Sequence, residues 1–200
     1  MMNINELLRA YEKGQRSFLG KNLQNVDLSQ VTLIGVDLAE ANLRGANLSR
    51  TFLTKANLRQ ACLRLANLTA AKLSQAILTR ADLTQANLSH AFLVQSNLEQ
   101  TQLKEATLQH SNLRQANLRG ANLQGANLQG ANLSEADLTH ANLEGANLTN
   151  TLLTGAILQN TNLRETLIYE PQSFSPLDLE CLTLPVNQFS LFSSPFLLQN

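Results

Sequence analysis

Basic side chains are the first residues in this sequence with evident chemistry. Between positions 41 and 80 there are seven of them and no acidic residue. They are Arg44, Arg50, Lys55, Arg59, Arg64, Lys72 and Arg80. Such a cluster suits contact with an acidic protein or with a nucleic-acid backbone. No aromatic platform of the kind that single-strand binders use is interleaved with it, so we expect a solvated basic region and disfavour nucleic-acid binding.

The charge is distributed unevenly along the chain. The formal net charge is zero, from 15 basic and 15 acidic residues, which argues against a bulk electrostatic binder of nucleic acid. Residues 16–120 hold 12 basic and six acidic residues, whereas residues 121–200 hold one basic and seven acidic residues. The two segments therefore carry +6 and −6. The sequence predicts a dipolar molecule that can present an oriented binding surface.

Recognisable catalytic and metal-binding motifs are missing from the sequence. It contains no phosphate-binding glycine loop, no zinc-ligand spacing and no nucleophile elbow. Cys62 and Cys181 cannot build a disulfide framework and suit a reducing compartment. No apolar run approaches the roughly 18 residues that span a membrane, and residues 1–18 lack a signal-peptide core. We therefore predict a soluble, cytoplasmic, non-enzymatic protein without cofactor or metal.

A five-residue repeat organises most of the chain. Leu occupies every fifth position from Leu23 to Leu163, 29 times without a break, and Phe18 and Ile168 extend this register. The residue two positions earlier is Ala at 19 of 31 sites, and the residue between them is Asn or Asp at 19 sites. Eight of the nine Gly lie two residues after the central Leu, where they supply a positive φ at a turn.

This period excludes a continuous helix or strand, because either would spread the Leu side chains over more than one face. Short extended pieces separated by corners keep both apolar positions of each repeat on one face. With those faces pointing inward, the chain must coil around its own core. The sequence therefore predicts a β-solenoid.

The repeat resembles that of the pentapeptide-repeat protein family. Its motif, A(N/D)LXX, is seen in Ala41-Asn42-Leu43-Arg44-Gly45 and covers residues 16–170. The resemblance implies an all-β fold, a right-handed quadrilateral parallel β-helix with four pentapeptides per coil. The 31 repeats would form about seven to eight coils, a rod roughly 37 Å long at the spacing of adjacent strands.

A coil of four pentapeptides would stack the matching side chains of successive coils in columns on one side of the rod. One column would place Phe52, Lys72 and Phe92 outward, with Ile34 and Val94 nearby. Exposed Phe where the repeat prefers Asn is an unfavourable departure, so this side is the predicted contact surface for a protein partner. Neutral drift at a loosely constrained position is the alternative.

Two further columns gather groups that bind anions or metals. Arg44 and Arg64 stack in one of them and complete the set of candidate partner-binding residues. His90 and His110 share the other with Arg50, but no third metal ligand is evident. We expect these histidines to be solvated surface residues.

The two ends differ from the repeat. Residues 4–13 show the apolar spacing of a helix and Gly14 is placed to end it, so residues 1–15 are expected to cap the core. Residues 171–200 form an apolar tail that contains all four Pro and no Lys or Arg.

Outward positions near the C-terminal end of the repeat are apolar. They are Leu152, Ile157 and Leu167, with Tyr169 beyond them. We expect this end to be covered, because a patch of this kind is a contact site in most proteins. The first candidate is the tail, residues 171–200, folded back on its own coil. The alternative is a second subunit, which would give a homodimer through the C-terminal end.

For function, the sequence predicts a non-enzymatic protein–protein interaction scaffold whose protein partner is unidentified. The best-understood branch of the family mimics duplex DNA through a strongly acidic, usually dimeric rod and binds type II topoisomerases. A DNA-mimicking inhibitor of gyrase is therefore the alternative, although the segment of net charge +6 argues against it. Nucleic-acid contact through residues 41–80 is a weaker alternative.

Overall fold

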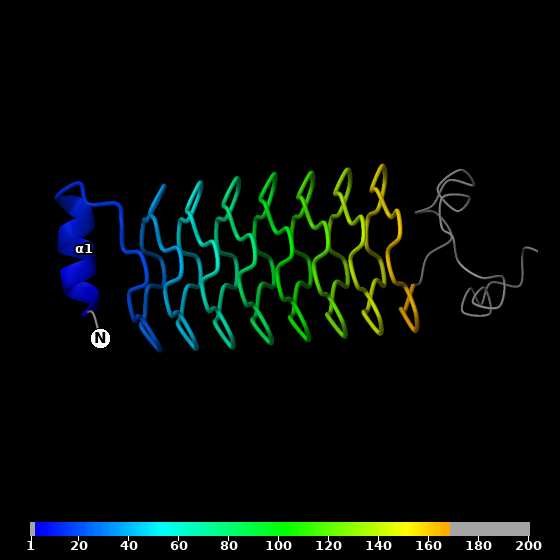
Figure 1. Cartoon of the computed structure of the whole chain (residues 1–200), viewed down its shortest axis with the longest axis horizontal. Helices are drawn as coiled ribbons and strands as arrows, with labels where there is room; N and C mark the ends of the chain where they lie inside the picture. Colours follow the sequence, from blue (N-terminus) through cyan, green and yellow to red (C-terminus); the bar gives the residue numbers. More distant parts are fainter. Residues whose placement is uncertain (1–2, 169–200) are drawn as a thin grey trace, which may run out of the picture.

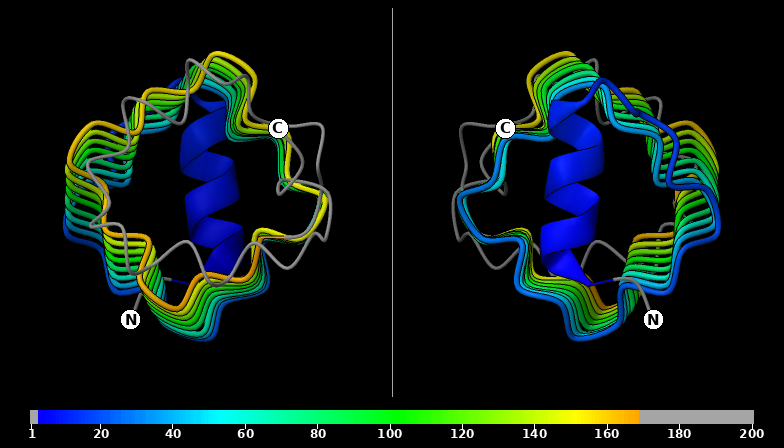
Figure 2. Two further views of the ribbon diagram at one scale, coloured as in Figure 1. Left: turned by 90° about the vertical axis from the view of Figure 1, so that its right-hand side faces the viewer. Right: turned by 90° about the vertical axis from the view of Figure 1, so that its left-hand side faces the viewer.

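The structure is a straight rod with a helix at one end (Figure 1). This computed structural model describes residues 3–168, and any prediction that falls on residues 1–2 or 169–200 lies outside the described residues. Seen end-on, the coils superimpose as a four-sided outline, and helix α1 (Ile4–Glu12) crosses its opening (Figure 2). The rod is therefore regular over its described length.

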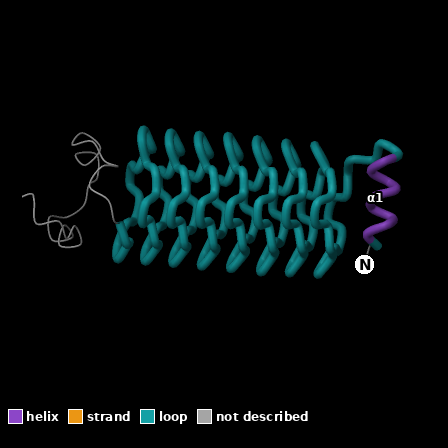
Figure 3. The backbone as a smooth tube through the Cα atoms, turned by 180° about the vertical axis from the view of Figure 1, so that it is seen from behind, coloured by secondary structure: helices purple, strands orange, loops and turns teal. Residues whose placement is uncertain are grey.

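Parallel pairing repeats once per coil. The residue before each central Leu pairs with its counterpart four repeats later, from Ser17 with Asp37 to Asn147 with Leu167. One coil therefore holds four five-residue sides. Each side pairs through a single residue, so the described part of the chain contains isolated bridges and no longer strand (Figure 3). The sequence predicted short extended pieces, and in the structure each of them contributes only one residue to β-pairing. The reason is that a corner follows each central Leu directly.

Backbone hydrogen bonds join each coil to the next. The N–H of a central Leu donates to a carbonyl of the following coil, as from Leu63 to Asp82 (2.7 Å). The N–H of the residue before it donates to the preceding coil, as from Cys62 to Ala41 (3.0 Å). A third bond closes each corner, as from Ala66 back to Leu63 (3.0 Å). Stacking of coils therefore satisfies most of the backbone N–H and C=O groups that point along the rod axis.

Every described corner requires a left-handed residue. The residue two positions after the central Leu has φ between 54° and 70° at all sites from Gly20 to Glu165. This confirms the turn geometry predicted from the glycines. Most corner positions nevertheless carry an L-residue, including Leu65 (φ 59°) and Ala70 (φ 56°), which adopt this region only with strain.

Leu and small side chains fill the interior of the rod. The central Leu side chains are fully buried through most of the coils, together with the Ala side chains two positions earlier. Where Thr replaces Ala, its hydroxyl donates to a carbonyl of the preceding coil, as from Thr51 to Leu28 (2.7 Å). The core is therefore a narrow column of stacked Leu, which explains why the sequence has so few aromatic residues.

Helix α1 begins at a capping box. Asn3 accepts the N–H of Asn5 through its side chain (2.9 Å), and the Glu6 carboxylate accepts the N–H of Asn3 (3.3 Å). These bonds satisfy N–H groups that have no partner inside the helix. The helix ends at Glu12, one residue before the predicted end, and Gly14 follows with φ 94°.

The inner face of α1 packs on the first coil. Leu7 is fully buried in the core, and the Tyr11 hydroxyl donates to the carbonyl of Ile34 (2.9 Å). The helix has nine residues, and no helix within residues 3–168 is long and apolar enough to cross a membrane.

Candidate partner-binding surface

Three residues form an outward column on the predicted contact side. Bridges pair Phe52 with Lys72 and Lys72 with Phe92. The two Phe are 43% and 40% exposed, and the Lys72 Nζ lies 3.3 Å from the centroid of the Phe92 ring. This cation–π contact holds the ammonium group against the ring. We call the side of the rod that carries this column the aromatic side.

The aromatic column gives up hydrogen bonds that the repeat makes elsewhere. In most repeats, the side-chain oxygen of the Asn or Asp before the central Leu accepts a hydrogen bond from the backbone N–H two residues later. Asn112 accepts the N–H of Arg114 in this way (3.1 Å). Phe and Lys side chains cannot accept this bond. As a result, the N–H groups of three residues have no acceptor within residues 3–168: Thr54, Ser74 and Val94. The column is therefore locally unfavourable for the rod that carries it.

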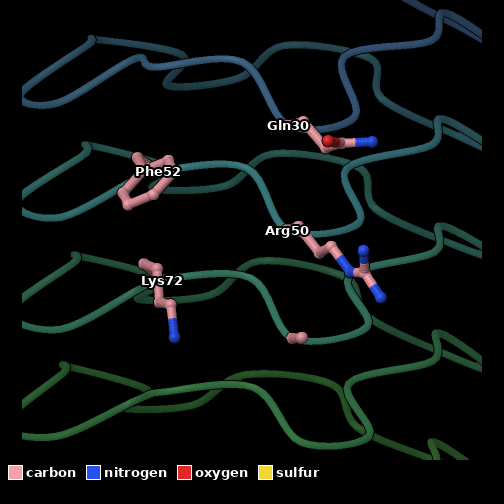
Figure 4. Close-up of a pocket in the computed structure, with 5 residues that line it drawn as sticks. Gln30, Arg50, Phe52 and Lys72 are labelled. Carbon is pink, nitrogen blue, oxygen red and sulfur yellow. The ribbon is translucent and has the colours of Figure 1, made fainter.

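A shallow hollow lies beside the column. Its volume is about 420 Å³, and it is lined by Gln30, Arg50, Phe52, Ala70 and Lys72. Phe52 and Lys72 form one flank, and Gln30 and Arg50 form the other (Figure 4). The hollow is therefore bordered by two cationic side chains, an amide and a phenyl ring, and the ends of Gln30 and Arg50 point away from Phe52 and Lys72 (Figure 4).

The structure divides the predicted partner-binding residues between two surfaces. The five-residue sides of Arg44 and Arg64 are half a coil away from those of Phe52 and Lys72, so the two pairs lie on opposite sides of the rod. Arg64 also forms an ion pair with Asp82 (3.4 Å). Phe52, Lys72 and Phe92 share one column, and Arg44 and Arg64 share another on the opposite side.

Arg50 belongs to this surface, although the sequence placed it only with the histidines. It lies at the corner two residues before Phe52, and it lines the hollow. The signal that could have found it is this spacing, because a corner residue borders the side that follows it. Ala70, one coil later in the same column, is the residue that leaves the space open.

His90 and His110 form a stacked pair next to the aromatic side. Their ring centroids are 5.3 Å apart and their planes differ by 15°. A Cβ at Gly130, one coil further, would lie 2.5 Å from the His110 Nδ1, so glycine makes room for the ring. Within residues 3–168, no group of three or more His, Cys, Asp and Glu could hold a metal ion.

The C-terminal end of the described rod is apolar on three sides. Leu152, Ile157 and Leu167 are 51%, 51% and 59% exposed. Tyr169 and the tail, residues 171–200, lie outside the described residues. What covers this end therefore stays a prediction.

Two Asp residues are tuned by the same local bonds that Asn makes elsewhere. Burial alone would raise the pKa of Asp137, but bonds from the hydroxyl and N–H of Thr139 and the guanidinium of Arg119 (3.0 Å) leave its pKa below the ordinary value. The N–H and hydroxyl of Ser29 lower the pKa of Asp27. Both carboxylates support corners and neither borders the hollow.

Comparisons with solved structures and curated proteins point to one group of proteins. HetL, a pentapeptide repeat protein involved in heterocyst differentiation regulation from the cyanobacterium Nostoc sp. strain PCC 7120, is 31% identical. The match covers 87% of this chain and 99% of HetL, with a TM-score of 0.31. A trypsin-treated variant of QnrB1, a plasmid-mediated fluoroquinolone resistance protein, is 18% identical over 85% of this chain and 97% of its own, with a TM-score of 0.49.

A curated relative from Synechocystis, the uncharacterized protein slr1152, is 70% identical over 33 residues, which are 16% of this chain and only 10% of that protein's length. A family model described as pentapeptide repeats, in eight copies, matches residues 22–60, 61–100, 101–139 and 131–167. The matched segments cover well over half of the chain and coincide with the coils of the rod. The chain therefore belongs to the pentapeptide-repeat family.

Proposed function

We propose that this protein is a non-enzymatic scaffold that binds another protein through its aromatic side. The observation that carries this proposal is the replacement of Asn by Phe, Lys and Phe in three successive coils at positions 52, 72 and 92. Each replacement removes a hydrogen bond from the rod, the two Phe expose apolar surface, and the same column returns to Asn at positions 112 and 132. An unfavourable feature that recurs in three successive coils of one side is typical of a binding site.

The filled interior also favours binding over catalysis. Stacked Leu and Ala side chains occupy the coil, so a substrate cannot enter it. The hollow on the aromatic side is shallow, and enzymes enclose most of a small substrate in a deeper cleft. We infer a cytoplasmic location as well, which the scarcity of Cys supports.

The test of this function is affinity capture from the native organism with a matched pair of variants. The Phe52→Asn/Phe92→Asn double variant restores the residue that the repeat prefers. Ile77→Asn makes the same change at an equally exposed position (43%) on another side. We expect a protein that the wild type and Ile77→Asn both retain and that the double variant loses. Equal retention by all three proteins would show that the aromatic side is not the contact surface.

A binder of a type II topoisomerase is the second candidate. The acidic segment, residues 121–200, favours it, but the basic segment gives the rod the wrong sign for mimicry of DNA over most of its length. Inhibition of gyrase supercoiling at a stoichiometric amount of this protein would reverse the order of the two candidates. Direct binding of nucleic acid through residues 41–80 ranks below both, and it requires an affinity that falls steeply with salt.

We also infer the finer shape of the scaffold. It is a right-handed quadrilateral β-helix of about seven to eight coils, with α1 as its N-terminal cap. Pairing between residues four repeats apart and the burial of Leu7 support this description. A crystal structure of the rod would test its handedness and its number of coils.

A further inference from the structure

The hollow on the aromatic side exists because one corner residue is small. Its corner column runs Gln30, Arg50, Ala70 and His90, and Ala70 alone has no side chain beyond Cβ. A gap of one coil therefore opens between the long side chains on either side. The Phe52–Lys72 pair closes the opposite flank of this gap (Figure 4).

Both cations of the hollow lack an anionic partner within residues 3–168. Elsewhere on the rod, several Arg side chains are paired with carboxylates, as in Arg64–Asp82 (3.4 Å) and Arg119–Asp137 (3.0 Å). Arg50 makes no ion pair or side-chain hydrogen bond with any described residue, and the ammonium group of Lys72 lies on the Phe92 ring without an ion pair or hydrogen bond to a described residue. The side chain of Arg50 is thus free to bind a ligand.

The aromatic side also carries no carboxylate over the coils that form the hollow. Its outward positions from 30 to 35, 50 to 55, 70 to 75 and 90 to 95 hold only neutral or basic residues. Apolar contacts lie next to the charges, because Ile34 is 47% exposed and the two Phe are 43% and 40% exposed. A partner that complements this surface must therefore be both acidic and partly apolar.

We propose that the hollow binds a carboxylate side chain from an acidic segment of the partner protein, and that an apolar residue of the same segment packs on Phe52. This inference rests on the proposed scaffold function and names the partner's chemistry. Arg50 presents a planar fork that matches a carboxylate, and Lys72 adds a second charge held in place by Phe92. The guanidinium of Arg50 points away from Lys72 (Figure 4), so the Arg50 side chain must turn toward the hollow for a bound carboxylate to contact both charges.

A single-stranded nucleic acid fits this surface less well. Phe52 and Phe92 are two coils apart in the column, with Lys72 between them, which places the rings about 10 Å apart at the spacing of adjacent strands. Successive bases need stacking platforms at closer intervals. The seven basic residues of 41–80, with Arg50 and Lys72 included, are spread over all four sides, so they cannot follow one backbone.

A short peptide tests the proposal directly. The probe is the acetylated and amidated peptide Glu-Glu-Trp-Glu-Glu, and its counterpart replaces each Glu by Gln. The protein contains no Trp, so the fluorescence of the peptide reports binding without interference. At low salt, we expect the acidic peptide to bind about tenfold more tightly than the Gln peptide, as a pair of charge-assisted bonds would allow.

Four variants locate the site. Arg50→Gln and Lys72→Gln should each weaken the acidic peptide about fivefold or more, whereas Arg59→Gln, on another side, should leave it unchanged. Ala70→Gln should abolish the preference for the acidic peptide, because it fills the hollow. Gln occupies the same left-handed position at many other corners, such as Gln60 and Gln85, so this variant should fold.

Three results would overturn the inference: equal affinity for both peptides, wild-type binding by Ala70→Gln, or tighter binding of oligothymidylate than of the acidic peptide. Affinity capture with the same variants distinguishes failure of the carboxylate site from failure of the proposed scaffold function. If Phe52→Asn/Phe92→Asn loses the partner while Arg50→Gln and Lys72→Gln retain it, the scaffold stands and the carboxylate site is wrong. If none of these variants changes the capture, the aromatic side itself is wrong.

Discussion

Corner residues show how the rod balances strain against repetition. All described corners need a positive φ, and an L-residue in that region is less stable than Gly by about 1 kcal/mol. Several Gln side chains and the His90–His110 pair lessen this penalty by bonding or stacking with the same corner of the next coil, as Gln75 does with Gln95 (3.2 Å). Leu65 has no such contact and is 52% exposed.

Leu65→Gly should therefore stabilise the protein by about 1 kcal/mol, because Gly adopts the required φ of 59° without strain. The free energy of unfolding in urea measures this change. The control is Ser89→Gly, at the corner position just before a left-handed residue, and it should destabilise by about 0.5–1 kcal/mol. Destabilisation by Leu65→Gly would show that its exposed side chain contributes packing.

Phe52→Asn should also stabilise the rod, by about 1 kcal/mol, because the new side chain can accept the N–H of Thr54. The reciprocal change Asn112→Phe removes the bond from Arg114 (3.1 Å) and should destabilise by a similar amount. Thermal unfolding of both variants checks the pair. A loss of stability in Phe52→Asn would mean that the ring supports the rod, which would weaken the case for a binding role.

Acid should destabilise the protein partly through Asp137. The pKa of this carboxyl is lowered in the folded state, so its contribution is present above the unfolded pKa of about 3.9 and is lost as the pH falls through the folded value. Asp137→Asn keeps an acceptor for Thr139 and does not titrate. Urea unfolding at about pH 6 and about pH 3 should show a smaller loss of stability for Asp137→Asn than for the wild type. Equal losses would show that other carboxylates dominate.

At the scale of elements, α1 and the coils form a one-dimensional stack in which each unit contacts only its neighbours. The helix covers the first coil and buries Leu7 completely. At the other end, the N–H groups of Leu153, Leu158 and Leu163 have no acceptor within residues 3–168. An edge of this kind can pair with another chain unless something covers it.

Leu7→Ala should detach the helix without unfolding the coils beyond it. Loss of a buried Leu costs about 3 kcal/mol, which corresponds to an increase of about 100-fold in hydrogen exchange within α1. Arg9→Ala, on the exposed face of the helix, should leave exchange unchanged. Uniformly faster exchange along the whole rod would contradict the nearest-neighbour description and show that the ends are coupled.

The whole molecule is a rod with a basic segment, an acidic segment and chemically different ends. This segregation places the unpaired cations of the hollow in the basic segment and the exposed Leu152, Ile157 and Leu167 in the acidic one. A partner held on the aromatic side and a contact at the C-terminal end would therefore not compete for the same surface. Binding at the first should weaken with salt, and association at the second should not.

Removal of residues 171–200 should make the protein associate at concentrations where the full chain does not. The apolar residues at the end of the rod would lose the cover that the sequence predicts for them. Sedimentation of both proteins measures this. If the full chain is a monomer, the tail covers the apolar end of the rod. If the full chain is a dimer, a second subunit covers it. A truncated protein that stays soluble and monomeric would contradict both.

The proposed contact surface was predictable from the sequence only in part. The spacing of four repeats per coil correctly placed Phe52, Lys72 and Phe92 in one column, since matching positions in successive coils must coincide. The same count puts the sides of Arg44 and Arg64 half a coil away, on the opposite side of the rod. It did not reveal that Arg64 pairs with Asp82, because that ion pair depends on how far long side chains reach between columns.

The five-residue period by itself determined which residues are inside and where the corners fall. The apolar spacing of the residues before the repeat located α1 to within one residue. Both follow from the local geometry of the chain. The tertiary structure alone decided that each side pairs through one residue, that Lys72 lies on the Phe92 ring and that Ala70 opens a hollow beside Arg50. These features arise between residues of different coils. Their side chains come into contact only after the chain has wound into coils. The repeat pattern of the sequence does not depend on these contacts, so it cannot reveal them.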